Sequence, residues 1–182
     1  MRVIAGSLKG RRLQSPTWAG LRPTSDSLRE TLFNVLAQRI EGARVLDGYA
    51  GTGAVGIEAY SRGAQMVAFV DRDPRAQRLI AANVDRCGIP RGCVIIRSGF
   101  DGGGAGRALP SGSFDIVVLD PPYDDQPEQV ILAVAPLVAP GGVLVLEHSK
   151  RRQAPDAIAT LTRTRQIVAG DSALSFYEHP PR

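Results

Sequence analysis

The chain has 182 residues, of which 43% are hydrophobic, with Gly 20 and Pro 13, and its formal net charge is +4. This composition indicates a globular domain of ordinary size and excludes a disordered chain. No apolar run is long enough to cross a bilayer and no secretory signal is evident, so we expect a soluble, cytoplasmic protein. Two cysteines and two histidines exclude a disulfide framework and make a metal site unexpected.

Positive charge is concentrated at the start of the chain. Residues 1–44 carry eight basic and three acidic side chains, whereas residues 45–182 carry fourteen basic and fifteen acidic ones. Because Arg and Lys make most protein contacts to phosphate, the first segment is predicted to face a polyanion. A merely solvated basic surface explains the charge equally well.

Residues 1–42 are expected to form an extension in front of the main domain. The stretch "RVIAGSLKGRRLQSP" predicts two short strands around a turn, and "SDSLRETLFNVLAQRI" predicts an amphipathic helix. Ser27 and Glu30 have the spacing of a capping box for that helix. The apolar side of the helix consists of Leu28, Leu32, Val35, Leu36 and Ile40.

From residue 43 onward, short β-branched runs alternate with helix-compatible segments. The predicted strands are 44–51, 66–71, 93–98, 114–120 and 142–148, and the predicted helices are 53–63, 74–88 and 128–138. Two further period-two stretches around Gly170 predict an antiparallel hairpin. This order predicts an α/β fold: a Rossmann-like, doubly wound sheet of seven strands, mostly parallel, with a C-terminal antiparallel hairpin.

The first strand leads into a glycine-rich loop, "LDGYAGTGAVG", with glycines in a G-x-G-x-x-G pattern. Such a loop admits a ligand to the backbone and offers amide donors, which suits either a dinucleotide or an adenosyl cofactor. Asp47 would crowd a pyrophosphate but could pair with an α-ammonium group, which favours S-adenosylmethionine over NAD. A tight turn without a ligand is the structural alternative. The expected cofactor contacts here are Asp47, Tyr49, Ala50, Gly51, Thr52 and Gly53.

The next two strands should complete a cofactor site. Asp71 ends the second strand, where a carboxylate can accept hydrogen bonds from both ribose hydroxyls, and Arg72 follows it. Asp73 is expected to cap the following helix. After the third strand, Phe100 could offer adenine an amide and an apolar face, and Asp101 could accept from the adenine amino group.

The fourth strand ends in "VVLDPPYDD", where two prolines follow a carboxylate. An exocyclic amino group on a base is a poor nucleophile because its lone pair is delocalised into the ring. The Asp120 carboxylate and the Pro121 carbonyl could accept its two hydrogens, and Pro122 would help to hold both acceptors rigid. Tyr123 could stack on the flipped base, which usually contributes about 1 to 3 kcal/mol. Alternatively, the prolines only end the strand and Tyr123 is packing.

Together these motifs resemble the Class I S-adenosylmethionine-dependent methyltransferases, whose amino-group members carry [DNS]-P-P-[YFW]. More narrowly, the chain resembles the RsmD-type enzymes, which methylate N2 of a guanine in 16S ribosomal RNA. The likeness lies in "RVIAGSLKGRRL", "GLRPTSDSLRETLFNVL", "VLDGYAGTGAVGIEAYSRGA", "FVDRDPRA", "VVLDPPY" and "GDSALSFYE". Adenine-specific DNA methyltransferases share Asp-Pro-Pro-Tyr but lack the "RPTSDSLRETLFN" segment.

The resemblance also implies roles for the extension. It implies an N-terminal RNA-binding extension over residues 1–42 and a methyltransferase domain over residues 43–182. The implied partner is 16S rRNA in the 30S subunit or its assembly intermediate, which places the protein in ribosome biogenesis. A monomer is the default expectation. The implied RNA-facing or entrance residues are Lys9, Arg11, Arg12, Arg22, Pro23, Thr24 and Arg29.

Two positions depart from the family's pattern, and other functions compete. Gly48 replaces a larger apolar or Cys residue, which predicts a looser loop, and Gly99 replaces an acidic or amide residue that commonly holds the adenine amino group. A DNA adenine-N6 or cytosine-N4 methyltransferase would need a separate target-recognition domain, for which the chain has no room. An RNA-binding assembly factor without catalysis would not need an intact Asp-Pro-Pro-Tyr. A nicotinamide dehydrogenase would need a proton-relay residue, and none is evident.

Overall fold

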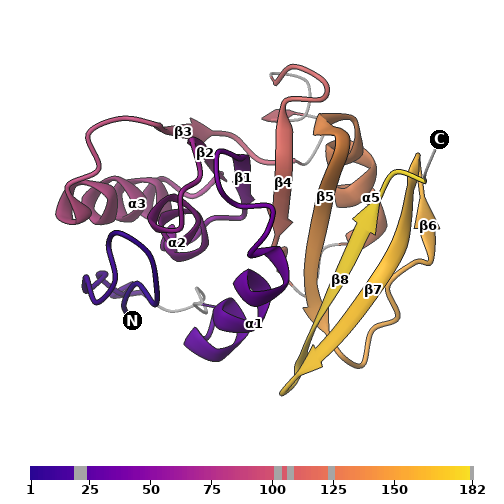
Figure 1. The fold of residues 1–182 in the computed structure, drawn as a ribbon, viewed down its shortest axis with the longest axis horizontal. Coiled ribbons are helices and arrows are strands. Elements are labelled where there is room, and N and C mark those ends of the chain that lie inside the picture. The colour runs from indigo at the N-terminus through magenta and orange to yellow at the C-terminus, as the bar shows by residue number, and fades with distance from the viewer. Residues whose placement is uncertain (19–23, 101–103, 106–108, 123–125, 181–182) are drawn as a thin grey trace.

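A computed structural model of the chain describes residues 1–18, 24–100, 104–105, 109–122 and 126–180. Eight strands form one sheet in the order β3-β2-β1-β4-β5-β8-β7-β6. Figure 1 shows that the N-terminal segment lies beside α2 and α3, away from β6 and β7. The strands are β1 (Arg44–Gly48), β2 (Met66–Asp71), β3 (Cys93–Arg97), β4 (Phe114–Leu119), β5 (Val138–Ser149), β6 (Ala157–Ile158), β7 (Leu161–Ala169) and β8 (Ser172–Glu178). The helices are α1 (Asp26–Leu36), α2 (Ala54–Ser61), α3 (Pro74–Cys87), α5 (Pro127–Val134) and the 3₁₀ turn η2 (Ala135–Leu137).

The parallel strands β1, β2 and β4 are apolar on both faces because helices cover both sides of this part of the sheet. Successive side chains point to opposite faces, so Val45 packs in the cluster under α1, α2 and α3, and Leu46 packs in the cluster under α5. The same alternation divides β2 and β4 between the two clusters. No helix in the described ranges is long and apolar enough to span a membrane.

The C-terminal strands confirm the predicted antiparallel hairpin. β8 pairs antiparallel with both β5 and β7, and Gly170 turns between β7 and β8 with φ 64°. The sheet has eight strands rather than seven because the two-residue strand β6 pairs with the start of β7. A pair of residues carries no periodicity, so this edge strand could not be predicted from the hydrophobic pattern.

Side-chain caps set the starts of α1 and α3. In α3 the Asp73 carboxylate accepts from the Arg75 amide at 2.8 Å, as predicted, and Gly88 ends the helix with φ 69°. In α1 the cap is Ser25, whose hydroxyl accepts from the Leu28 amide at 3.2 Å. The predicted capping box of Ser27 and Glu30 is therefore wrong, because the helix begins before it.

Residues 1–18 form an N-terminal arm that packs on the rest of the chain. Its predicted strand pair appears as one antiparallel bridge between Arg2 and Arg12 rather than as regular strands. The fully buried Glu58 of α2 accepts hydrogen bonds from the Ile4 amide at 2.7 Å and the Ala5 amide at 3.0 Å. Apolar side chains of the arm also join the core cluster under α1 and α2, so the arm and the sheet share one core.

Glu58→Ala should lower the free energy of unfolding by about 3 kcal/mol, because it removes the acceptor of two arm amides and the partner of Arg62, 2.7 Å away. The arm should also become accessible to trypsin at Lys9 and Arg11. Urea denaturation and limited proteolysis measure the two effects. The control Glu30→Ala, on the exposed side of α1, should change stability by less than about 0.5 kcal/mol. A loss no larger than the control's would contradict this role of Glu58.

Candidate active site

The glycine loop after β1 has a backbone that few sequences tolerate. Tyr49, Gly51 and Gly53 have φ values of 61°, 56° and 75°, all in the left-handed region. Glycine adopts this region freely, but a bulky residue such as Tyr49 is strained there, and such strain concentrates at functional sites. Gly53 is also the N-cap of α2 and provides no side-chain cap. The loop therefore presents backbone at a helix N-terminus, as a cofactor site requires.

Asp71 is fixed to this loop by its two carboxylate oxygens. One oxygen accepts from the Gly51 amide at 2.9 Å, and the other accepts from the Asp73 amide at 2.8 Å. A carboxylate oxygen has a further lone pair, so the half-buried Asp71 can still accept from hydroxyl groups. This donor and acceptor set fits an adenosyl ribose. Arg72, the next residue, is exposed.

Asp47 lies beneath the loop and is only 3% exposed. Its carboxylate accepts from the Gly56 amide in the first turn of α2 at 2.8 Å. Burial raises the pKa of Asp47 to about 8, although the hydrogen bond from Gly56 lowers it; the nearby charge of Asp71 also raises it. The contact with Gly56 was not foreseen from the sequence, and the pairing of Asp47 with an α-ammonium group stays a prediction.

Two aromatic side chains pack around the start of the loop. The Tyr49 and Phe100 ring centroids are 5.5 Å apart, and Phe100 is 4% exposed. A Cβ added at Gly48 would lie 2.6 Å from a Leu119 methyl and 3.0 Å from the Phe100 ring. The expected looser loop is therefore wrong, because these two side chains fill the space that a larger residue would take. Ala50 and Thr52 are buried, and Asp101 lies outside the described residues.

The candidate catalytic corner, Asp120 to Pro122, stands beside this loop because β4 pairs with β1. The pairing ends at Gly48 with Leu119, and the Asp120 amide then donates to the Gly48 carbonyl at 3.3 Å. Asp120 is half-buried, Pro121 is buried and Pro122 is exposed. Tyr123 lies outside the described residues. The two motifs, more than sixty residues apart, thus meet at the carboxyl edge of adjacent strands.

The extension reaches the same corner through Thr24. Its hydroxyl donates to the Asp120 carboxylate at 3.4 Å, and the contact joins positions 96 residues apart. Arg22 and Pro23 lie outside the part of the chain that can be described. Lys9, Arg11 and Arg12 are all exposed on the arm.

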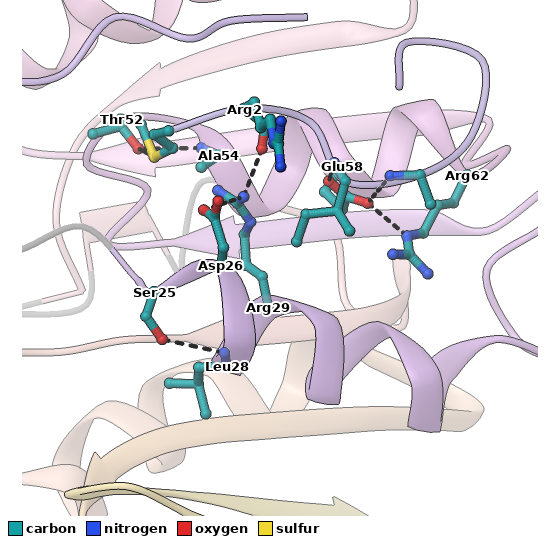
Figure 2. A network of polar contacts seen from close by, with 12 residues as sticks. Arg2, Ser25, Asp26, Leu28, Arg29, Thr52, Ala54, Glu58 and Arg62 are labelled. Atoms are coloured by element: carbon teal, nitrogen blue, oxygen red, sulfur yellow. Dashed lines mark hydrogen bonds and ion pairs between the residues drawn. The ribbon is translucent and has the colours of Figure 1, made fainter. Parts of the chain in front are cut away.

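Arg29 is the predicted site residue that the structure places elsewhere. It has no exposed surface and donates to the Arg2 carbonyl at 2.7 Å and to the Asp26 carboxylate at 2.9 Å (Figure 2). Burial lowers the pKa of its guanidinium. An enclosed guanidinium cannot contact RNA, so Arg29 connects α1 to the arm instead. The burial of Arg29 depends on the docked arm, whose Arg2 carbonyl accepts from it, so neighbouring residues in the sequence do not indicate it.

Glu147 lies beside Asp120 at the end of the pairing between β4 and β5, and it was not predicted from the sequence as a site residue. The pairing of β4 with β5 ends at Leu119 with Leu146, so Asp120 and Glu147 are the next residues on adjacent strands. Strand alternation places both on the face that α1 covers, and the Ser172 hydroxyl donates to the Glu147 carboxylate at 3.1 Å. An acidic residue near the end of the predicted strand 142–148 was the available signal. No group of three or more His, Cys, Asp or Glu suited to a metal occurs among the described residues.

The strand order, the glycine loop after β1 and the Asp-Pro-Pro corner after β4 define an α/β fold of the methyltransferase type. Residues 1–178 match the family described as conserved hypothetical protein 95. The chain belongs to this family, that of the RsmD-type methyltransferases, as its motifs predicted.

Some relatives of the chain match nearly all of it. It is 32% identical to "Putative rRNA methyltransferase YlbH" of Bacillus subtilis (strain 168) over 181 residues, which is 98% of each protein. It is 33% identical to "Ribosomal RNA small subunit methyltransferase D" of Escherichia coli (strain K12), covering 98% of this chain and 89% of that one. The solved structure "Putative methyltransferase yhhF from Escherichia coli" matches with a TM-score of 0.84 at 29% identity, covering 98% of this chain and 97% of that one.

The pKa of Asp47 predicts how cofactor affinity depends on pH. Below about 8 the free protein holds Asp47 protonated, and pairing with an α-ammonium group needs the carboxylate, so binding should release a proton. The affinity for S-adenosylhomocysteine, which keeps the α-ammonium group, should rise by up to about tenfold per pH unit until Asp47 ionises, and then level off.

Calorimetry in buffers of different ionisation enthalpy counts the protons released. Asp47→Asn should bind with an affinity that is independent of pH over the same range. Glu128→Gln, an exposed change on α5, should keep the wild-type slope. The same rise in the Asp47→Asn variant would show that another group titrates.

Proposed function

We propose that the protein methylates the exocyclic N2 amino group of a guanine in 16S rRNA, with S-adenosylmethionine as the methyl donor. The observation that carries this proposal is the position of Asp120, whose amide is bound to the Gly48 carbonyl at 3.3 Å beside the glycine loop. The names of the relatives support ribosomal RNA as the substrate class. We further propose that the protein is a cytoplasmic monomer and acts on the 30S subunit or its assembly intermediate.

The residues divide into those that hold the cofactor and those that hold the base. Asp71 and the loop from Asp47 to Gly53 would hold S-adenosylmethionine, which supplies an electrophilic methyl group when bound. The Asp120 carboxylate and the Pro121 carbonyl would each accept one hydrogen of the target amino group. This pair draws the nitrogen toward pyramidal geometry and frees its lone pair. Both acceptors are rigid, since prolines at 121 and 122 restrict φ, so little reorganisation opposes the reaction.

The basic extension would bring the RNA to this corner. Residues 1–42, as the proposed RNA-binding extension, carry exposed cations on the arm, and Thr24 donates to the Asp120 carboxylate at 3.4 Å. The proposed methyltransferase domain, residues 43–182, contains the cofactor loop and the catalytic corner. A contact between the extension and Asp120 would link RNA binding to the position of the acceptor.

Glu147 would provide selectivity for guanine. Guanine carries an N1–H next to its N2 amino group, whereas the corresponding ring nitrogen of adenine or cytosine is an acceptor. If Asp120 accepts from N2, a second carboxylate on the adjacent strand is placed to accept from N1–H. The Ser172 hydroxyl, 3.1 Å from Glu147, would orient that carboxylate.

Asp120→Ala should reduce kcat for methyl transfer by about 100-fold or more, since removal of one preorganised polar group typically has this effect. Binding of S-adenosylhomocysteine should be nearly unchanged, because the glycine loop and Asp71 remain. Transfer of a labelled methyl group is measured with 30S subunits, naked 16S rRNA and DNA as acceptors. Glu128→Ala, exposed on α5, is the control and should behave as wild type. Equal loss of transfer and of cofactor binding would contradict the role of Asp120.

Glu147→Gln tests guanine selectivity with 30S subunits reconstituted to carry either guanine or 2-aminopurine at the mapped target. 2-Aminopurine keeps the amino group but has an acceptor at N1. On guanine the variant should lose about 10-fold or more in kcat/KM, because a hydrogen bond to a charged group contributes about 1.5 to 3 kcal/mol. On 2-aminopurine it should be more active than wild type, because a glutamine amide can donate to N1. An equal loss on both bases would leave Glu147 with only a structural role.

A further inference from the structure

Two segments that are distant in the sequence hold the positive charge of the protein. Residues 1–44 have eight basic and three acidic side chains, and residues 74–97 have five arginines and a single acidic residue, Asp85. All other positions together have nine basic and fourteen acidic side chains. The modest net charge of +4 therefore conceals two strongly basic segments in an otherwise acidic chain.

The structure joins these segments into one surface. The arm runs along α3 toward the start of that helix: Asn83 exchanges hydrogen bonds with the Gln14 amide at 2.7 Å and carbonyl at 3.2 Å, and the Arg75 guanidinium lies 5.3 Å from the centre of the Trp18 ring. Figure 1 shows the N-terminal segment beside α2 and α3 at the end of the sheet that contains β3.

The same docking gathers the cations at the far end of α3. The Arg86 guanidinium donates to the Arg12 carbonyl at 3.0 Å. Arg11, the residue before Arg12 on the arm, is exposed. These contacts satisfy a backbone carbonyl and neutralise no charge. Because like charges repel, gathering these cations where Asp85 is the single acidic side chain of α3 is unfavourable for the isolated protein and favourable when a polyanion binds.

A surface pocket of about 300 Å³ lies between α3 and the edge strand β3. Its lining consists of Pro74, Gln77, Arg78, Ala81, Ile95 and Arg97. Both arginines are exposed, and neither has an ion-pair partner within the described ranges of the chain. Arg75, one helical turn before Arg78, does have an ion-pair partner, because its guanidinium lies 2.7 Å from the Asp73 carboxylate.

The pocket is adjacent to the candidate cofactor site. Arg97 is the cross-strand partner of Asp71, and the Gln77 side-chain amide donates to the Asp71 carbonyl at 2.8 Å. An anion in the pocket would thus lie one strand from the carboxylate that holds the glycine loop. Guanidinium groups bind phosphate through parallel N–H donors, which suits two arginines that line one hollow.

We propose that the arm, α3 and β3 form one binding surface for the phosphate backbone of the RNA, and that the pocket between Arg78 and Arg97 takes a phosphate away from the target nucleotide. This inference rests on the proposed function, which supplies RNA as the partner. It extends the RNA contact from the arm to the outer edge of the sheet, where the sequence predicted only a helix and a strand.

The test compares Arg78→Gln, Arg97→Gln and the double variant with the wild-type protein, using a fluorescein-labelled RNA stem-loop and a series of KCl concentrations. Each lost phosphate contact should make the plot of log Kd against log salt shallower by about 0.7 to 0.9. The KM for 30S subunits should rise while kcat stays within about twofold, because RNA positioning at a distance changes binding rather than chemistry. The Kd of S-adenosylhomocysteine should not change.

The matched control is Arg165→Gln, which removes an exposed arginine from β7, near the opposite edge of the sheet. It should leave the salt slope at the wild-type value. An unchanged slope in the double variant, or an equal change in the control, would overturn the proposal. Weaker cofactor binding in the double variant would overturn it too, by assigning the pocket to the cofactor. A wild-type protein that binds the stem-loop through these arginines but methylates no RNA would refute the proposed function and leave the surface standing.

Discussion

The pairing of β1 with β4 is the constraint on which the candidate site depends. It places Gly48 opposite Leu119, so the glycine loop and the Asp-Pro-Pro corner leave the sheet side by side. The hydrogen bond from the Asp120 amide to the Gly48 carbonyl, 3.3 Å long, continues the ladder by one residue into the loop. A one-residue slip in this register would turn Asp120 to the other face of the sheet, away from α1. Burial on both faces of β1 and β4 makes such a slip costly, so the core fixes the geometry of the site.

Buried polar groups fix the arm in a comparable way. Asn83 has no exposed surface and connects three segments, because it bonds the backbone of Gln14 and also donates to the Thr52 carbonyl at 2.9 Å. Arg29 is equally buried, and its Nε and Nη1 atoms have no hydrogen-bond partner among the described residues. Leaving such donors unpaired is unfavourable, so apolar packing of α1 must offset it. These directional contacts hold the arm in the position that brings Trp18 to α3.

The sequence predicted what depends on local pattern and on sheet topology. Strand alternation and the helix caps of α3 follow from neighbouring residues, and the meeting of the glycine loop with Asp120 follows from the strand order of doubly wound sheets. What it missed depends on packing between distant segments. The family resemblance predicted Arg29 at the substrate entrance, but its guanidinium is buried and donates to the carbonyl of Arg2 and the carboxylate of Asp26. The arginines of α3 form a larger basic surface only together with the arm, and the sequence does not predict that the arm lies along this helix.

The distribution of charge around the site explains why the proposed RNA surface stands apart from the proposed chemistry. Asp71, Asp120 and Glu147 lie at or near the carboxyl ends of three parallel strands, so this edge of the sheet is rich in carboxylates. A cationic methyl donor and an amino group with hydrogens to donate suit such a site, whereas a phosphate is repelled by it. A polyanion must therefore be held from outside, by cations far enough away not to neutralise the acceptors. Arginines on the arm, α3 and β3 meet that condition, because they border the acidic edge and face solvent, so only the uncharged base has to enter.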